Sequence, residues 1–146
     1  MPRDDSKAAR WCQKAADQGQ ASAQDAMGRI YFTGRGVPTD YAIAVRCFKE
    51  AAEQGEVSSQ YMLGLIYTTG QKGVSEDEAK SVYWLKKAAD QGHADAQCEL
   101  GERLLYGIFG ADRDQKTACR LLSASAKQGH EKAAARYKQS CVKAKK

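Results

Sequence analysis

The chain has 146 residues, of which 42% are hydrophobic and 28% are charged, and its formal net charge at pH 7 is +5. This composition suits one globular domain, and the two prolines and many alanines favour helices over a β-sandwich or barrel. No apolar run approaches the ~20 residues of a membrane-spanning helix, and the polar start MPRDDSKAAR is not typical of a signal peptide. Part of the positive charge falls in residues 143–146, and elsewhere lysines alternate with acidic residues, so we expect no basic face for nucleic acid.

A short string recurs along the chain and closes each time on a glycine. The strings KAADQG, EAAEQG, KAADQG and SAKQG end at Gly19, Gly55, Gly92 and Gly129, which are 36, 37 and 37 residues apart. A fixed period of this length indicates a solenoid, which offers a long surface rather than one deep active site. Each repeat is predicted to hold two helices: a first-type helix after the glycine and a second-type helix before the next one.

The chain begins inside a repeat, with a second-type helix predicted over residues 4–18 and Asp4 at its start. Ala8, Cys12 and Ala15 form its stripe of small residues, and Trp11 widens that stripe. No first-type helix precedes this segment in the chain, so we expect part of its apolar face to meet solvent, a preceding repeat or another molecule. End-to-end self-association through this helix is one expectation.

First-type helices are predicted over residues 21–34, 57–70 and 94–107, where apolar or small residues recur at i, i+3, i+4 and i+7. Each carries a glycine at mid-helix, and these are Gly28, Gly64 and Gly101. A glycine there costs about 1 kcal/mol relative to alanine, so we expect a close approach of the partner helix as the reason. The helices are expected to end on glycine caps at Gly34, Gly70 and Gly107.

Second-type helices are predicted to begin at aspartates, whose carboxylates satisfy free N–H groups at a helix start. These are Asp40, Asp77 and Asp114. Ser75 and Glu78 are predicted to form a capping box. A stripe of small and larger apolar residues then packs each helix on the preceding one, as in Ala44, Phe48 and Ala51.

A last helix over about 130–144 occupies a first-type position and is predicted to cap the array. Lys138 stands where the other first-type helices carry glycine. A lysine does not suit a close helix crossing, so we expect this face to meet water.

The recurring pattern AAxQGxxxAQxxLGxxYxxGxGVxxD resembles the Sel-1-like repeat, a relative of the tetratricopeptide repeat. The matching residues are Leu63, Gly64, Tyr67, Gly70, Asp77, Ala88, Ala89, Gln91 and Gly92. Single copies depart from the pattern: Leu104 replaces the tyrosine, Met27 the leucine and Ser125 an alanine. The resemblance implies an all-α, right-handed α-solenoid of antiparallel helix pairs. It implies a single domain over 1–146, with a half-repeat helix at 4–18, repeats at about 20–55, 56–92 and 93–129, and a capping helix at about 130–144.

Neither the cysteines nor the histidines form a recognisable reactive or metal-binding pattern. An odd count of five cysteines without CxxC leaves two alternatives: buried free thiols in a reducing compartment, or one disulfide, Cys119 with Cys141, in an oxidising one. His93 and His130 both follow the glycine of the recurring string, which favours a role in the turn over metal binding. We therefore expect no catalytic residue, no metal and no cofactor.

In related solenoids, five positions of each first-type helix line the concave face. Carried over by register, these positions predict a partner-binding surface of Arg29, Phe32, Tyr61, Leu65, Thr68, Glu102, Leu105 and Tyr106. The fold itself does not require the apolar members of this set, and aromatic residues near an arginine are common in binding hot spots. The alternative is that some of them pack against loops or neighbouring helices.

The resemblance implies a non-catalytic adaptor that binds a polypeptide on its concave face. An alternative is a bacterial immunity or regulatory protein that binds and inhibits a toxin or effector enzyme. A remote alternative is a β-lactamase-like enzyme, as described for cysteine-rich relatives, but Ala16, Ala52 and Ala89 stand where those relatives carry a paired cysteine. The expected location is the cytoplasm or, if a signal peptide has been removed, the periplasm or the exterior.

Overall fold

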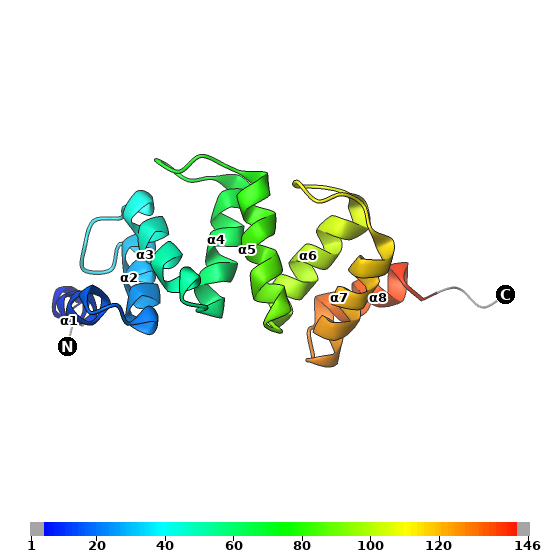
Figure 1. Ribbon diagram of the computed structural model, residues 1–146, viewed down its shortest axis with the longest axis horizontal. Coiled ribbons are helices and arrows are strands. Elements are labelled where there is room, and N and C mark those ends of the chain that lie inside the picture. The colour runs from blue at the N-terminus through cyan, green and yellow to red at the C-terminus, as the bar shows by residue number, and fades with distance from the viewer. Residues whose placement is uncertain (1–4, 143–146) are drawn as a thin grey trace. The chain divides into compact units, whose positions relative to one another are not determined.

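The computed structural model describes residues 5–142, and its regular structure there is helical apart from one isolated bridge between Gln71 and Val74. The helices of this range (Figure 1) are α1 (Asp5–Asp17), α2 (Ala21–Thr33), α3 (Tyr41–Glu53), α4 (Val57–Thr69), α5 (Glu78–Asp90), α6 (Ala94–Tyr106), α7 (Gln115–Lys127) and α8 (Glu131–Ser140). The predicted all-α fold is therefore confirmed. Within the described residues, no helix is long and apolar enough to cross a lipid bilayer.

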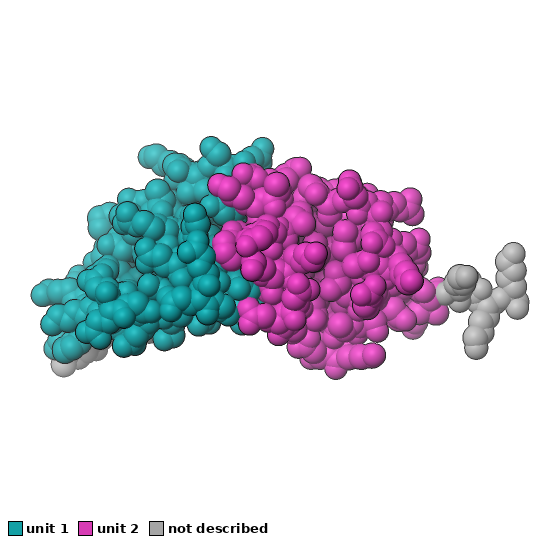
Figure 2. All heavy atoms as spheres, in the orientation of Figure 1, with its two compact units in different colours: residues 1–76 teal, residues 77–146 magenta. Residues whose placement is uncertain are grey.

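The chain forms two compact units, residues 1–76 and residues 77–146 (Figure 2). Unit 1 holds α1 to α4 and unit 2 holds α5 to α8. In each unit, consecutive helices pack against one another. The α2–α3 and α6–α7 hairpins make the most extensive helix–helix contacts of all.

The mid-helix glycines are explained where α2 crosses α3 and where α6 crosses α7. A Cβ atom on Gly28 would lie 2.7 Å from the ring of Phe48, and one on Gly101 would lie 3.0 Å from the side chain of Leu122. Phe48 and Leu122 are fully buried. A large side chain on the second-type helix thus fills the space that the glycine leaves, which confirms the close approach at these two crossings.

The predicted aspartate caps are confirmed at α3, α5 and α7. The carboxylates of Asp40, Asp77 and Asp114 each accept a hydrogen bond of 3.1 Å from the backbone N–H three residues later. The predicted Ser75–Glu78 capping box is wrong, because Asp77 takes the capping position and Glu78 is the first helical residue. Asp4, predicted to open the first helix, lies outside the described residues.

Glycine caps end two of the first-type helices in the expected left-handed conformation. Gly34 has φ 76° and ψ 34°, and Gly107 has φ 66° and ψ 50°. Gly70 also has a positive φ of 69°, but its ψ of 171° takes the chain away from the left-handed helical region. The cap at Gly70 therefore differs from the predicted geometry although a glycine is still required there.

The last helix is shorter than predicted and is covalently attached. α8 ends at Ser140, and residues 143 and 144 of the predicted helix lie outside the described residues. Cys141 forms a disulfide with Cys119 of α7, so the structure holds the second of the two cysteine alternatives. Cys12 and Cys47 are partly buried free thiols, and Cys98 is a buried one. Lys138 is exposed, as expected for a helix face that meets water.

The apolar face of α1 is partly exposed, as the stripe of Ala8, Cys12 and Ala15 predicted. The indole of Trp11 is 64% exposed, and the ammonium of Lys14 lies 5.3 Å from its centre. Ala9, in contrast, is buried at 5% exposure.

Candidate functional site

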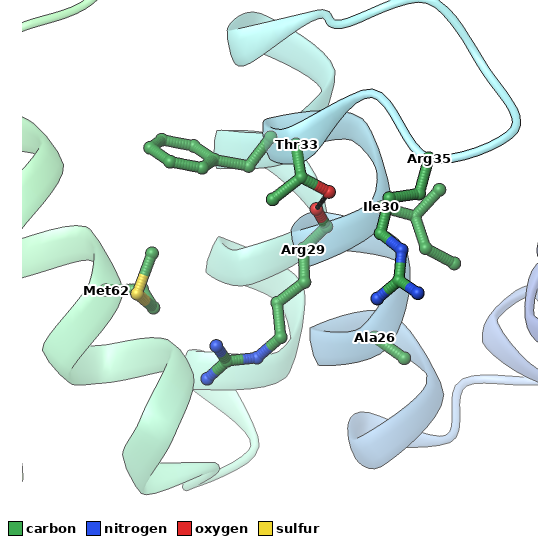
Figure 3. A pocket seen from close by; sticks show the side chains of 7 residues that line it. Ala26, Arg29, Ile30, Thr33, Arg35 and Met62 are labelled. Atoms are coloured by element: carbon green, nitrogen blue, oxygen red, sulfur yellow. Dashed lines mark hydrogen bonds between the residues drawn. The ribbon is translucent and has the colours of Figure 1, made fainter.

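A groove of about 570 Å³ lies on the first-type helices of unit 1 (Figure 3). Its lining residues are Ala26, Arg29, Ile30, Phe32 and Thr33 of α2, Arg35 of the loop after α2, and Met62 of α4. Four of these, at positions 26, 29, 30 and 33, have the i, i+3, i+4, i+7 spacing of one helix face. The groove thus follows the outer face of α2 and reaches across to α4.

Arg29 is held at the groove by a network that also joins α2 to α4. Its Nε atom lies 3.0 Å from the Asp25 carboxylate, and its side chain stays 50% exposed. The same carboxylate accepts hydrogen bonds from the hydroxyls of Ser58, at 3.1 Å, and Ser59, at 2.6 Å, both on α4. Asp25 therefore orients the guanidinium while it links the two helices.

The other groove residues combine apolar surface with a second guanidinium. The hydroxyl of Thr33 donates to the backbone carbonyl of Arg29 at 2.8 Å, so this group is satisfied within α2. Phe32 packs its ring against Tyr41 of α3 with centroids 5.2 Å apart. In Figure 3, Arg29 reaches toward α4 and Met62, whereas Arg35 lies on the side of Ile30. The groove therefore has an apolar floor between two arginines.

Three predicted residues lie on α4 and do not line this groove. Tyr61, Leu65 and Thr68 are all partly buried. The hydroxyl of Thr68 donates to the backbone carbonyl of Gly64 at 2.8 Å, which places it against its own helix.

The three predicted residues of unit 2 have different environments. Glu102 accepts contacts from Lys132 at 3.0 Å and Arg136 at 3.1 Å, so its carboxylate ties α6 to α8. Tyr106 is 49% exposed, with the guanidinium of Arg136 5.7 Å from its ring. Leu105 is only 6% exposed and belongs to the apolar core that α6, α7 and α8 share.

Leu105 is therefore corrected from a surface residue to a core residue. The physical reason is α8, whose Ala133 joins Leu105 and Leu122 in one buried cluster. Leu105 occupies the helix position of Phe32, but its side chain is buried in this cluster, and it also lines a hollow of about 430 Å³ together with Tyr106.

Thiol and imidazole groups often act as nucleophiles or bases in enzymes, but in this protein the thiol of Cys98 and the imidazoles of His93 and His130 have structural roles. Burial, together with the nearby Glu102 carboxylate, raises the pKa of the Cys98 thiol to about 11, so the thiol stays protonated at neutral pH. The Nδ1 atoms of His93 and His130 accept the backbone N–H groups of Ala96 and Ala133 at 3.1 Å, which caps α6 and α8. The predicted role of both histidines at the turn is thus confirmed. Among the described residues, no group of three or more His, Cys, Asp or Glu side chains is placed to hold a metal ion.

Two features of the structure were not foreseen from the sequence. The side chain of Gln54 donates to buried Gln24 at 2.6 Å, and Gln128 donates to buried Gln97 at 2.9 Å, so the glutamines of two of the recurring strings each support a first-type helix. These glutamine pairs could have been predicted from the regular spacing of the glutamines in the repeat. A second hollow, of about 950 Å³, lies by α5 and α7, where Lys86, Arg113 and Asp90 mix with Leu100.

Comparison with known proteins agrees with this architecture. A family model described as the Sel1 repeat matches residues 1–20, 21–56, 57–93 and 94–130. The chain belongs to the Sel1 repeat family. Sel1 repeats commonly act as protein–protein interaction modules, and proteins built from them are generally non-catalytic scaffolds. The fold is accordingly the all-α solenoid of this family.

Two solved Sel1 structures share more than a third of their aligned residues with this chain. A protective antigen of uropathogenic Escherichia coli, with an SLR fold, has a TM-score of 0.91 and 37% identity over 98% of this chain and 31% of its own. The chain therefore spans about a third of that protein's length. A Sel1 repeat protein of Oxalobacter formigenes has a TM-score of 0.80 and 36% identity over 88% of this chain and 95% of its own.

A more distant structure supports the fold alone. The cysteine rich protein B of Helicobacter pylori has a TM-score of 0.67 and 19% identity, over 87% of this chain and 95% of its own. No curated protein matches the chain.

Proposed function

We propose that this protein is a non-catalytic interaction module that holds a segment of another polypeptide on its first-type helices, with the groove on α2 and α4 as the main contact. The observation that carries the proposal is the combination in that groove of an exposed guanidinium with apolar side chains, at Arg29, Phe32 and Met62.

The groove has the chemistry of a peptide site. Ile30, Phe32 and Met62 offer apolar surface to a hydrophobic side chain, and Arg29 and Arg35 offer charge to a carboxylate. Arginine and aromatic residues supply a large share of the energy in protein interfaces. Because Asp25 already orients Arg29, little side-chain freedom is lost when a ligand binds. The expected ligand is a segment with an apolar residue beside an acidic one.

The chemistry of the remaining polar groups supports binding rather than catalysis. The thiol of Cys98 is buried and protonated, and the ring nitrogens that accept hydrogen bonds in His93 and His130 serve as helix caps. A nucleophile needs a base that is available to it, and these histidines are occupied by backbone N–H groups.

The disulfide supports the periplasmic or secreted location over the cytoplasmic one, because disulfides persist in oxidising compartments. Thiol labelling of the protein in its source cell tests this. Modification at Cys119 and Cys141 without prior reduction would place the protein in a reducing compartment.

Capture from the source cell tests the proposed function. The protein and its Arg29→Ala/Phe32→Ala variant are each used as bait, with Tyr83→Ala of α5 as a matched control that also removes an exposed aromatic ring. We expect at least tenfold weaker capture by the groove variant, with a melting temperature within a few degrees of the native one, and unchanged capture by the control. Equal capture by all three baits would contradict a binding role of the groove.

The narrower alternative, an immunity or regulatory protein that inhibits a toxin enzyme, depends on the same test. It is distinguished by the captured partner: a purified partner enzyme would lose its activity when the protein is added at equal concentration. Full activity of a captured enzyme would contradict inhibition while leaving the interaction function intact.

A further inference from the structure

The loop after α6 carries an exposed apolar tip that its counterparts in the same chain lack. Ile108 is 41% exposed and Phe109 is 46% exposed. In the loop after α4 the corresponding residues are Gln71 and Lys72. Because a loop of the same length connects two helices there with polar residues, folding does not require the apolar pair. We call Ile108 and Phe109 the loop knob.

The ring of the loop knob lies against a buried side chain of unit 2. Phe109 has a φ of 51°, and it is the only non-glycine residue of the described range with a positive φ, a region unfavourable for a bulky side chain. The guanidinium of Arg103 lies 5.4 Å from its ring centre, although the Arg103 side chain itself is only 1% exposed. Arg103 donates in turn to Ser81 at 2.7 Å and pairs with Glu99. The ring is thus presented to solvent by a rigid support, which lowers the entropy lost on binding.

Charges around the loop knob complement those around the groove of unit 1. Glu78 lies against Gly110, where an added Cβ atom would be 2.8 Å from the Glu78 side chain, and exposed Asp112 follows two residues later. Arg113 packs at the other end of the loop, against Gly107. The groove, for its part, has an apolar floor with Arg29 and Arg35 at its sides.

We propose that the chain associates with a second copy of itself, with the loop knob of one copy seated in the groove on α2 and α4 of the other. The apolar ring and the Ile108 side chain then contact Ile30, Phe32 and Met62, while Asp112 and Glu78 approach the two arginines. The groove volume of about 570 Å³ is within the usual range for sites that take a small ligand, so it accommodates two side chains.

The contact is heterologous, because the knob and the groove are different surfaces. The resulting dimer therefore still offers one free knob and one free groove, and association continues into longer chains as concentration rises. The interface is small, so we expect weak binding with a Kd on the order of 0.1 mM. The second copy occupies the same groove as the foreign polypeptide of the proposed function, whereas the knob lies outside that surface.

Sedimentation velocity over a range from low micromolar to near-millimolar protein tests the proposal. We expect the sedimentation coefficient of the native protein to rise with concentration. An Ile108→Ala/Phe109→Ala variant should associate at least tenfold more weakly, and a Lys72→Ala variant, altered at the matching loop position, should behave as the native protein does. A native protein that stays monomeric throughout, or association that survives the double alanine change, would overturn the proposal.

Mixing two variants gives the sharpest form of the test. The Ile108→Ala/Phe109→Ala variant keeps its groove, and an Arg35→Glu variant keeps its knob, so each alone should be monomeric while the mixture forms a one-to-one dimer. The charge reversal Asp112→Arg should restore association to the Arg35→Glu variant. A mixture that remains monomeric at concentrations where the native protein associates would show that another surface is used, and the knob-in-groove contact would be wrong. Because the Ile108→Ala/Phe109→Ala variant keeps its groove, we expect it to capture a foreign partner as the native protein does, whichever of these results is obtained.

Discussion

The contact between α2 and α4 in unit 1 and the contact between α6 and α8 in unit 2 join equivalent helices of the repeat in different ways. In unit 1, one carboxylate, Asp25, accepts hydrogen bonds from two serine hydroxyls. In unit 2, Glu102 pairs with Lys132 and Arg136, and Asp95 contacts His130 at 2.8 Å. A disulfide attaches α8 as well. The first contact leaves a groove open and the second encloses a core.

Equivalent positions therefore have different exposure in the two units. Phe32 and Leu105 occupy the same position in their helices, yet Phe32 lines a groove whereas Leu105 is 6% exposed inside a cluster with Ala133 and Leu122. The repeat determines the position of a residue on its helix, and the neighbouring helix determines whether its side chain is buried. Surface residues of a repeat array therefore cannot be assigned from register alone.

The largest effect on stability is expected at Leu105, and the same substitution at Phe32 should have a much smaller one. Leu105→Ala should lower the free energy of unfolding by about 2–5 kcal/mol, because it empties buried volume that its neighbours cannot fill. Phe32→Ala should cost about 1 kcal/mol, mainly its edge contact with Tyr41. Urea titration of both variants measures the difference. Equal losses would remove the distinction between groove and core.

Breaking the disulfide should affect unit 2 and spare unit 1. The Cys119→Ser/Cys141→Ser variant should lose about 3 kcal/mol of stability, since the bond closes a loop with a sequence separation of 22 residues. Amide hydrogen exchange should become faster in α7 and α8 but not in α2 and α3. Cys47→Ser, which alters a free thiol of unit 1, is the control. Unchanged exchange in α8 would mean that its non-covalent contacts suffice.

The two glutamine pairs should contribute unequally. Gln128 donates to Gly92 at 2.8 Å in addition to Gln97, whereas the strong bond of Gln54 is the one to Gln24. We therefore expect Gln128→Ala to cost more than Gln54→Ala, with both losses in the range of about 1–3 kcal/mol that a buried unsatisfied amide produces. Thermal unfolding of the two variants compares them. A larger loss for Gln54→Ala would reverse the proposed ranking.

Mild acid should weaken unit 2 through His93, and this loss of stability should be the smallest of those predicted. Burial lowers the pKa of His93, although Asp95 acts in the opposite direction. The unfolded chain, with an ordinary histidine pKa of about 6.5, binds the proton first, so stability present above that pH is lost as the pH falls toward the lower pKa of the folded state. A proton on Nδ1 also removes the acceptor for Ala96, and the loss is limited to the worth of a helix cap, about 1 kcal/mol.

His93→Asn keeps a capping acceptor that does not titrate, so this variant should lack the His93 part of the acid effect. Exchange measurements at pH 7 and pH 5 test the prediction. The helices α2 and α4 of unit 1 have Gln20 and Glu56 as N-cap residues, without a side-chain cap bond, so they should not respond through this mechanism. An equal response of both units would point to another titrating group.

Features that depend on nearby residues in the chain were predictable. The caps at Asp40 and Asp114 follow from the chemistry of the helix start, and the glycines at 28 and 101 imply a close neighbour because they are unfavourable in a helix. The failed capping box shows the limit of such rules, because Asp77 offered a better acceptor two residues away.

Features that depend on the identity of residues in the next repeat were not predictable. The burial of Leu105 requires Ala133, and the arrangement of Arg29 requires Asp25 to be shared with Ser58 and Ser59. These partners lie about one repeat away, and no pattern of single residues specifies how they meet. Two of the predicted positions, Arg29 and Phe32, do line the groove, which keeps them in the proposed site.

The central claim is that the side chains on α2 bind a partner while the matching side chain on α6 holds the fold together. The most direct measurement is partner capture and urea stability, recorded in parallel for Arg29→Ala/Phe32→Ala and for Leu105→Ala. We expect the α2 variant to lose capture at least tenfold with nearly native stability, and the α6 variant to lose stability while its folded fraction still captures the partner. Native capture by the α2 variant, with stability lost instead, would contradict the claim.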